Sequence, residues 1–206
     1  MNSIDITIKN PKGINMELLT ICLRDGSFNS RVLTIVEELA RKLRQRTHRF
    51  DKVDQVPLFN EDRELTPSSA VTSLRTRVKH SDAVLIATPE YRGSMPGVLK
   101  NLLDWAARPV GESMFISLPV AVISASPSEH GGARARQSTE FALERKGAAV
   151  VSTGRGLPHA HRRENKDTGF LEDSAVGQLR SIITRLSANH ESDVSAQVAE
   201  LTDEAA

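Results

Sequence analysis

Arg24, Ser27 and Asn29 lie in a short polar loop between an apolar segment and an amphipathic one. A loop that leads from a strand into a helix offers free backbone N–H groups and the positive end of the helix dipole, which together favour a phosphate. Arg24 can add charge and a bidentate hydrogen bond, and Gly26 allows a tight turn. The loop therefore predicts a phosphate site, although Ser27 and Asn29 can equally be residues that cap the following helix.

Two more polar loops follow later apolar segments. The continuous apolar run at 83–87 is typical of a buried parallel strand, and it leads into the string TPEYRGSMPGVLKNLLDW at 88–105. A second such run, at 120–124, leads into a loop that contains the GGAR run at 131–134. Open α/β sheets hold their ligands outside the carboxyl ends of their strands, so we expect these loops to form a ligand site.

Segments typical of strands and helices alternate along the chain. We expect strands at 17–23, 49–55, 83–87, 120–124 and 148–151. We expect helices at 30–44, 96–107, 131–146 and 171–186, with Gly147 at the end of the third of these. A further helix is expected to start at Pro67, with Thr66 as its cap. Strands that alternate with helices predict an α/β fold, in which a parallel sheet has helices on both faces.

These loops carry the signature of a known family. The string at 88–105 resembles the TPEYNxSxPGxLKNxxDW signature of the NAD(P)H-dependent FMN reductases, a flavodoxin-like family that includes quinone, chromate and azo-dye reductases. Residues 23–29 resemble the end of its GSLRxGSFN phosphate loop, and GGAR is a further match. The resemblance covers 17–187 and implies a flavodoxin-like three-layer sandwich. Its five-stranded parallel sheet would have the order 2-1-3-4-5, with FMN between the first and third strands.

Three positions depart from the family pattern. Arg92 stands where the family usually has Asn, and Ile21 and Cys22 stand where it has Gly and Ser. Loss of the Ser hydroxyl removes a donor worth about 1–2 kcal/mol if that donor binds the phosphate, and Ile21 could crowd the backbone. We hypothesise that Arg92 favours an anionic partner, such as the NADPH phosphate or an acidic acceptor, although an exposed arginine with no specific role is an equal alternative.

By this resemblance, three loops bind non-covalent FMN. The first would hold the phosphate, the second would hold the isoalloxazine ring, and Ser126 would add a contact from the third. The predicted FMN contacts are Cys22, Leu23, Arg24, Asp25, Gly26, Ser27, Phe28, Asn29, Pro89, Glu90, Tyr91, Arg92, Gly93 and Ser126. The resemblance implies no catalytic side chain, because the flavin carries the hydride, and no metal ligand. His130 is expected to be an ordinary loop residue.

Composition argues against several function classes. The 206 residues include 27 basic and 26 acidic ones, a net charge of +1, which argues against a nucleic-acid-binding protein. No apolar run approaches the roughly 20 residues of a membrane helix, and 1–16 lack the apolar core of a secretion signal. We expect a cytoplasmic protein with no membrane or nucleic-acid partner. An extension at 1–16 precedes the domain at 17–187, and the polar tail at 188–206 is expected to be mobile.

Other polar clusters are expected to have structural roles. The basic run at 41–49 is expected on the solvated side of a helix, and His159 and His161 lack the partners that a metal site needs. Trp105 is expected in the core or in a subunit interface. In the related reductases the helix at 96–107 lies near the dimer interface, so the resemblance implies a homodimer or homotetramer.

The loops and the resemblance together predict an FMN-dependent oxidoreductase. It would pass a hydride from NADPH or NADH to bound FMN and then reduce a small acceptor, which could be a quinone, a flavin, a metal oxyanion or an azo compound. Two alternatives stay open: a non-catalytic flavin-binding electron carrier or sensor, and a degenerate homologue that has lost FMN. Flavodoxin carriers are typically strongly acidic, and this chain is not.

Overall fold

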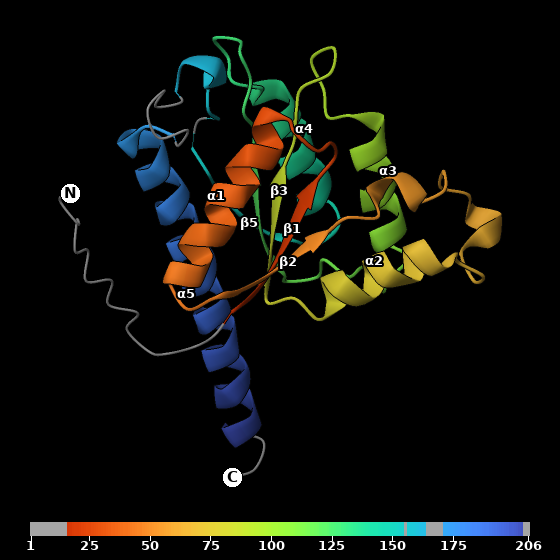
Figure 1. The fold of residues 1–206 in the computed structure, drawn as a ribbon. Helices are drawn as coiled ribbons and strands as arrows, with labels where there is room; N and C mark the ends of the chain where they lie inside the picture. The colour runs from red at the N-terminus through yellow and green to blue at the C-terminus, as the bar shows by residue number, and fades with distance from the viewer. Residues whose placement is uncertain (1–15, 155, 164–170, 204–206) are drawn as a thin grey trace.

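One parallel sheet forms the centre of the molecule in a computed structural model that describes residues 16–154, 156–163 and 171–203 (Figure 1). The strands are β1 (Glu17–Cys22), β2 (Arg46–Phe50), β3 (Ala83–Ala87), β4 (Pro119–Ile123) and β5 (Ala149–Val151). They follow the order β2-β1-β3-β4-β5, and every neighbouring pair is parallel. This arrangement confirms the predicted flavodoxin-like sheet. The expected extension at 1–16 lies outside the described residues except for its last residue.

Helices cover both faces of the sheet (Figure 1). They are α1 (Phe28–Lys42), α2 (Ser69–Lys79), α3 (Gly97–Ala106), α4 (Ala133–Glu144) and α5 (Asp173–Asp203). Short 3-10 helices span Val53–Gln55, Glu61–Arg63 and Ala160–Arg162. Helices α1 and α5 share one buried cluster with Leu18 and Leu85 of the sheet, whereas α2, α3 and α4 contribute to a second cluster with Leu19 and Ile86.

The residues of β1 show why both faces of the sheet are apolar. Side chains alternate between the two faces of a strand, so Leu18 lies toward α1 and α5 while Leu19 and Ile21 lie on the side of α2 and α3. All five residues of β3 are buried, as expected for a strand that is covered on both sides. Each fully buried Leu or Ile contributes about 1.5–3 kcal/mol, so these alternating sets hold both helical layers in place.

Helix α2 begins later than predicted. Its first residue is Ser69, and its cap is Ser68, whose Oγ accepts a hydrogen bond from the backbone N–H of Val71 at 3.4 Å. The prediction that Thr66 caps the helix with Pro67 at its first position was therefore wrong. Ser and Thr are both favoured caps, and the apolar pattern alone could not choose between them.

Strand β2 lies earlier in the chain than the predicted 49–55. It pairs with β1 from Glu17 opposite Arg46 to Ile21 opposite Phe50. As an edge strand it is largely exposed to solvent, and only Phe50 is fully buried. Because most of its residues are polar, the strand lacks the apolar run that identifies the central strands.

The last helix is longer than predicted. Helix α5 continues to Asp203, which corrects the predicted end at Leu186. The sequence between these two residues contains no Gly or Pro that would end the helix. Figure 1 shows that the C-terminal part of α5 projects beyond the sheet.

Helix α4 ends close to the glycine that was predicted to end it. The last residue is Glu144, and Gly147 follows in the left-handed conformation with φ +88°. The backbone N–H of Ala148 donates to the carbonyl of Leu143 at 3.1 Å, which closes the helix end. A residue with a Cβ would be strained at this φ, so the glycine is required by geometry.

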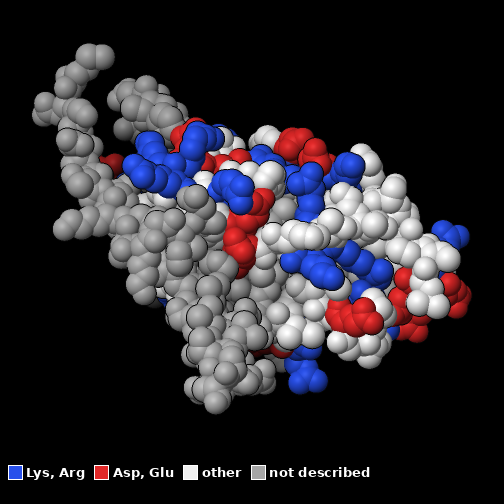
Figure 2. Space-filling model, turned by 90° about the horizontal axis from the view of Figure 1, so that it is seen from below, with Lys and Arg blue, Asp and Glu red and all other residues white. Residues whose placement is uncertain are grey.

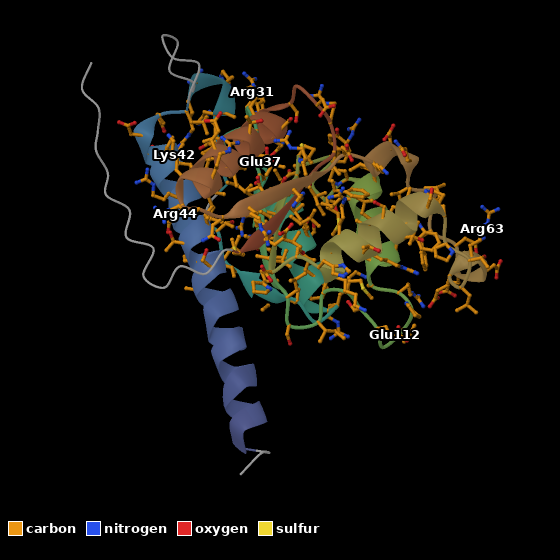
Figure 3. All side chains as sticks on the ribbon, turned by 60° about the horizontal axis from the view of Figure 1, so that its bottom comes forward. Arg31, Glu37, Lys42, Arg44, Arg63 and Glu112 are labelled. Carbon is orange, nitrogen blue, oxygen red and sulfur yellow. The ribbon has the colours of Figure 1, made fainter. Side chains whose placement is uncertain are left out.

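Basic and acidic side chains are interspersed on the face shown in Figure 2. Within the run 41–49, Lys42 and Arg44 are exposed and lie at the outer edge of the molecule in Figure 3, as predicted. Arg49 is different, because its Nε lies 2.9 Å from Oε1 of Glu37 on α1. Among the described helices, none combines the length and the apolar character that a membrane span requires.

Candidate active site at the carboxyl ends of three strands

Three loops begin side by side at one edge of the sheet. In the strand register Cys22 lies opposite Ala87, and Ala87 lies opposite Ile123, so β1, β3 and β4 end at the same level. The loops at 23–27, 88–96 and 124–132 follow these strand ends. The structure thus brings together the three segments that were predicted to form the site.

The predicted FMN contacts differ in their exposure to solvent. Those in the exposed class are Arg24, Asp25, Gly26, Tyr91 and Arg92. Those partly buried are Cys22, Leu23, Phe28, Pro89, Glu90, Gly93 and Ser126, and those buried are Ser27 and Asn29. The exposed residues are the ones free to touch a ligand directly, and the buried ones have partners within the protein.

Ser27 caps α1. Its Oγ accepts from the N–H of Ser30 at 3.1 Å and donates to the carbonyl of Arg24 at 2.8 Å. The capping role that the sequence left open is therefore the one that the structure shows for this side chain. Among the first N–H groups of α1, Ser27 Oγ accepts from that of Ser30. The N–H groups of Phe28 and Asn29 have no partner within the helix and can meet an anion.

Asn29 joins the first loop to the third. Its Nδ2 donates to the carbonyl of Ala125 at 3.1 Å, and its Oδ1 accepts from the N–H of Ala125 at 2.9 Å. The side chain is 2% exposed. Asn29 was predicted to contact FMN, and the structure shows that its side-chain amide is bonded at both ends to the backbone of the third loop.

Ile21 and Cys22, the two departures before the phosphate loop, lie on opposite sides of β1. Ile21 is buried in the cluster beneath α2 and α3, so its side chain lies in the core and does not crowd the loop. The Sγ of Cys22 lies 3.7 Å from the carbonyl oxygen of Arg24 and 3.9 Å from Oγ of Ser27. The thiol of Cys22 therefore packs against the inside of the loop, at the position where the family pattern has the hydroxyl of a serine.

The second loop contains a tight turn from Tyr91 to Ser94. The two residues exchange backbone hydrogen bonds of 3.0 and 3.2 Å, and the residues between them, Arg92 and Gly93, have φ +52° and φ +81°. Two successive positive φ angles define a type I′ turn, which favours Asn or Gly at its first central position. The turn explains the Asn of the family pattern and leaves Arg92 in a strained conformation. Tyr91 is 54% exposed beside it.

Glu90 joins the second loop to the third. Its Oε2 accepts from the N–H groups of Arg134 at 3.0 Å and Ala135 at 3.3 Å, in the first turn of α4. The N-cap of this helix, Gly132, has no side chain to offer, and the first turn of α4 contains no acidic residue. Glu90 therefore supplies the negative charge that stabilises the start of α4. The carboxylate is engaged here, which argues against a role as a catalytic base.

The third loop is held by the segment that follows β5. The carbonyl of Leu157 accepts from the N–H of Ser126 at 3.1 Å, and the N–H of Leu157 donates to Ser124 at 2.7 Å. A Cβ at Gly156 would lie 2.5 Å from the carbonyl oxygen of Gly131, so only glycine fits there. This support was missed in the sequence, where 154–170 showed no regular pattern. Ser126 itself is partly exposed, and its Oγ accepts from Ser128 N at 3.2 Å.

Arg134, which belongs to the GGAR run, reaches the second loop. Its side chain lies over the turn, and a Cβ placed on Gly93 would be 3.5 Å from its Nη1. Arg134 is exposed and lies in the first turn of α4. His130 is exposed in the third loop, as predicted. Within the described ranges, no group of three His, Cys, Asp or Glu residues could hold a metal ion.

The fold and these loops define a flavodoxin-like enzyme of the FMN-binding type. Residues 16–163 match the model of the NADPH-dependent FMN reductase family, and the chain belongs to that family. This finding confirms the resemblance that was read from the loop at 88–105 and the loop at 23–29.

Similar proteins extend the comparison. A quinone reductase of Pseudomonas putida is 38% identical over 81% of this chain and 89% of its own length. An NADPH azoreductase of a Bacillus species is 36% identical over 66% of this chain and 72% of its own. Among solved structures, FerB, a flavoenzyme NAD(P)H:(acceptor) oxidoreductase from Paracoccus denitrificans, has a TM-score of 0.76 and 28% identity, over 87% of this chain and 98% of that chain.

The residues present fit FMN. The first turn of α1 offers N–H groups for a phosphate, and the space beside Gly26 is open, with no atom within 4 Å of a Cβ placed there. The chain is an FMN-dependent oxidoreductase that uses NADPH or NADH. FMN, when bound, supplies the chemistry, which is the transfer of a hydride from the nicotinamide and the reduction of a small acceptor. The protein's own part is to hold and orient these molecules.

Proposed function

We propose that the three loops bind FMN with its phosphate at the start of α1 and its ring against 89–93. The observation that carries this proposal is that β1 and β3 end at the same level, so the loop that leads into α1 and the loop that contains the turn at 91–94 begin side by side. In this assignment Arg24 pairs with the phosphate, and backbone groups of the second loop face the ring. The unit that carries the function is 17–187, between the extension at 1–16 and the tail at 188–206.

A comparison of two flavins tests this placement. FMN and riboflavin differ only by the phosphate, so Arg24→Gln should weaken FMN binding about tenfold to a hundredfold and leave riboflavin binding unchanged. The matched control is Arg63→Gln, because Arg63 is exposed at the end of the short 3-10 helix at Glu61–Arg63, far from Arg31 of α1 (Figure 3). Equal loss of both flavins would place Arg24 near the ring, and no loss of either would remove it from the site.

In this assignment, Asn29 and Glu90 act by positioning. Asn29 fixes the third loop against the first, and Glu90 fixes the start of α4 against the second loop. Ser126 would then approach the ring from the third loop. No side chain is assigned a proton transfer, because the described site holds no titratable group that is free and enclosed.

For the acceptor, we infer a quinone. The support is that the relative from Pseudomonas putida, which covers most of this chain, is named a quinone reductase. The exposed face of Tyr91 in the second loop offers a flat aromatic surface on which a quinone could stack. Steady-state oxidation of NADPH with a benzoquinone, an azo dye, free FMN or chromate as acceptor would rank the four classes. A higher kcat/KM for any other acceptor would reject this inference.

The anionic partner of Arg92 is the 2′-phosphate of NADPH in this proposal. Arg92 and Arg134 both present exposed guanidinium groups beside the turn at 91–94. Arg92→Gln removes the charge without giving the turn a preferred residue, so it should reduce the preference for NADPH over NADH. An unchanged ratio of kcat/KM for the two nucleotides would leave Arg92 without this role.

A homodimer is proposed as the working assembly. Several large apolar side chains are exposed on or near α3 and α4, including Val98 at 38%, Val110 at 79% and Phe141 at 66%. Trp105 is not among them, since it is 1% exposed and its Nε1 donates to the carbonyl of Pro57 at 2.8 Å. Light scattering should give twice the monomer mass, and Phe141→Lys should give the monomer. A homotetramer is the alternative outcome.

The cytoplasm is the proposed location, with no membrane or nucleic-acid partner. NADPH and NADH are supplied there, and the one cysteine of the chain cannot form an intramolecular disulfide. Cell fractionation with antibody detection tests the proposal, and recovery in the membrane fraction would contradict it.

A further inference from the structure

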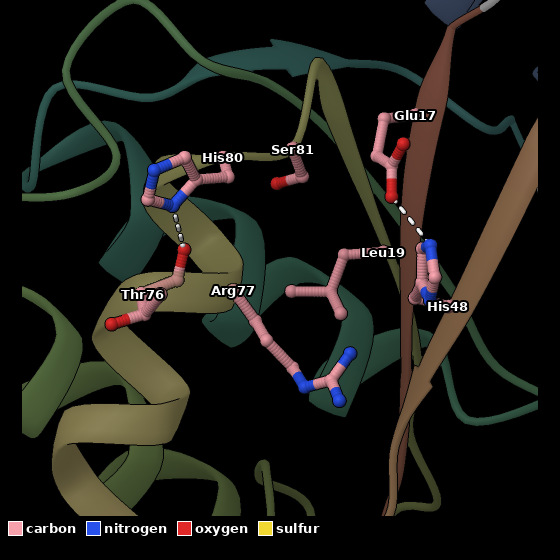
Figure 4. Close-up of a pocket in the computed structure, with 7 residues that line it drawn as sticks. All are labelled: Glu17, Leu19, His48, Thr76, Arg77, His80 and Ser81. Atoms are coloured by element: carbon pink, nitrogen blue, oxygen red, sulfur yellow. Dashed lines mark hydrogen bonds and ion pairs between the residues drawn. The ribbon is translucent and has the colours of Figure 1, made fainter.

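A groove outside the FMN site opens on the face of the sheet that α2 covers (Figure 4). It lies between strands β1 and β2 and the C-terminal end of α2, and its cavity is about 240 Å³. Glu17, the first residue of β1, and Ser81, just before β3, both line it. The groove is therefore at the amino ends of the strands, at the opposite edge of the sheet from the three loops.

The apolar surface of the groove comes from parts of polar side chains. Leu19 of β1 lies at its base but is only 1% exposed, so a ligand would reach instead the ring of His48, whose side chain is 51% exposed, and the carbon chain of Arg77. Ser81 adds no free hydroxyl hydrogen, because its Oγ donates to the carbonyl of Val78 at 2.8 Å. Pockets for drug-sized ligands span roughly 300–1,000 Å³, so a cavity of this volume suits a smaller molecule that has an apolar body.

The acidic group in the groove is already compensated. The Oε1 of Glu17 lies 2.6 Å from Nε2 of His48, and its Oε2 lies 3.2 Å from Nε of Arg46. Both carboxylate oxygens thus face a donor, so the carboxylate is not free to bind a cationic ligand. The negative charge of Glu17 is offset by these two donors, so it repels an anion in the groove less strongly than an unpaired carboxylate would.

Arg77 is the charged group of the groove that lacks such a partner. Within the part of the chain that the structure describes, its guanidinium makes no hydrogen bond or ion pair. Figure 4 shows its side chain extending from α2 across the groove toward the strand that carries His48, with Leu19 between them. A guanidinium binds a carboxylate through two parallel hydrogen bonds, which a point charge cannot do.

We propose that this groove binds a small carboxylate with an apolar body. The carboxylate pairs with the guanidinium of Arg77, and the apolar body packs between the carbon chain of Arg77 and the ring of His48, above Leu19. Benzoate is the simplest probe of this chemistry. The groove is remote from the three loops, so the proposal does not depend on how FMN is bound.

The test is a titration followed by the amide NMR signals of the full chain, with FMN and without it. Benzoate should shift the signals of His48, Arg77 and Ser81 to saturation, in both samples. Arg77→Gln should weaken the binding about tenfold or more, whereas Arg63→Gln should leave it unchanged. Benzyl alcohol, which has the same ring without the charge, should also bind at least about tenfold more weakly.

Three outcomes would overturn the proposal. The first is the lack of saturable shifts at the groove, and the second is equal affinity of benzoate for the wild type and Arg77→Gln. The third is inorganic phosphate binding at the same signals as tightly as benzoate, which would show that the apolar surface of the groove contributes nothing. Arg77 is exposed, so its substitution is not expected to impair folding.

Discussion

The side chain of Asn29 is hydrogen-bonded at both ends to the backbone of one residue, Ala125, which lies 96 positions further along the chain. A buried amide that satisfies both the N–H and the C=O of its partner acts as a bridge between the loops after β1 and β4. Glu90 forms a second bridge, from the loop after β3 to the first turn of α4. The two bridges fix the relative positions of all three loops of the proposed FMN site.

Replacement of Asn29 by alanine should both destabilise the fold and weaken FMN binding. The buried N–H and C=O of Ala125 would lose their partner, which costs about 1–3 kcal/mol for each unsatisfied group. Urea unfolding should show a loss of about 2–4 kcal/mol, and FMN titration a higher Kd. Asn189→Ala is the control, because the exposed side chain of Asn189 donates to a carbonyl of its own helix, that of Arg185, at 2.8 Å. An unchanged urea midpoint for Asn29→Ala would show that the bridge has no energetic role.

Glu90→Gln should preserve turnover while lowering stability. The substitution keeps an acceptor at the start of α4 but removes the charge, which at a helix N-terminus is worth about 0.3–1 kcal/mol. Glu90→Ala removes both and should cost about 0.5–2 kcal/mol. The readouts are urea unfolding and kcat at saturating substrates. Loss of kcat by orders of magnitude in the Gln variant, with its stability intact, would reveal the catalytic role that this account denies.

Arg92→Asn should stabilise the protein. Asn tolerates the left-handed conformation of the turn at 91–94, which costs about 1–2 kcal/mol for most other residues, so we expect a gain of about 0.5–1 kcal/mol. Arg44 also has a positive φ, of +60°, at the end of α1, far from the site, and Arg44→Asn should give a similar gain. Arg63→Asn, in a segment of ordinary backbone, should give none. Thermal unfolding of the three variants measures the differences, and a gain at Arg63 equal to the others would rule out the conformational explanation.

Glu140 should make stability depend on pH. Burial raises the pKa of its carboxyl above the ordinary 4.5, and the hydrogen bonds and charge of Arg136 on the same helix offset this only in part. The folded chain then holds the proton of Glu140 more tightly than the unfolded chain does. Glu140 therefore stabilises the fold at pH values below its ordinary pKa, and this contribution is lost as the pH rises through its raised pKa.

The matching variant is Glu140→Gln, which does not titrate. Its stability relative to the wild type should increase as the pH is raised from about 4 to about 7, measured by urea unfolding at each pH. Glu112→Gln, in an exposed loop (Figure 3), controls for the general change in charge. A relative stability that decreases over the same range would show that pairing with Arg136 outweighs burial.

The architecture could be predicted from the sequence, because buried strands such as 83–87 are continuous apolar runs and the amphipathic helices alternate with them. Edge strand β2 could not be placed, since its residues are polar and its position depends on pairing with β1. The predicted start of α2 was wrong, because Thr66 and Ser68 are both favoured helix caps and only tertiary packing selects between them.

The site was predicted less completely than the fold. The three loops follow the strands where the sequence placed them, because Gly26 and the string at 88–105 signal strand-to-helix turns. Local sequence, however, does not show which polar side chains are taken by distant partners. Asn29 and Glu90 both look like ligand contacts in the sequence, and both are engaged by backbone groups of the third loop and α4. Ile21 looked like an obstacle, and only the strand register shows that it lies in the core.

The most direct test of the account is a titration of the purified protein with FMN, followed by absorbance, after which NADPH is added without oxygen. We predict saturable binding of FMN and then loss of the visible absorbance of the bound flavin, as expected for an NAD(P)H-dependent oxidoreductase. Binding without that loss would indicate a flavin carrier or sensor. The absence of saturable binding would contradict the central claim that the loops after β1, β3 and β4 form an FMN site.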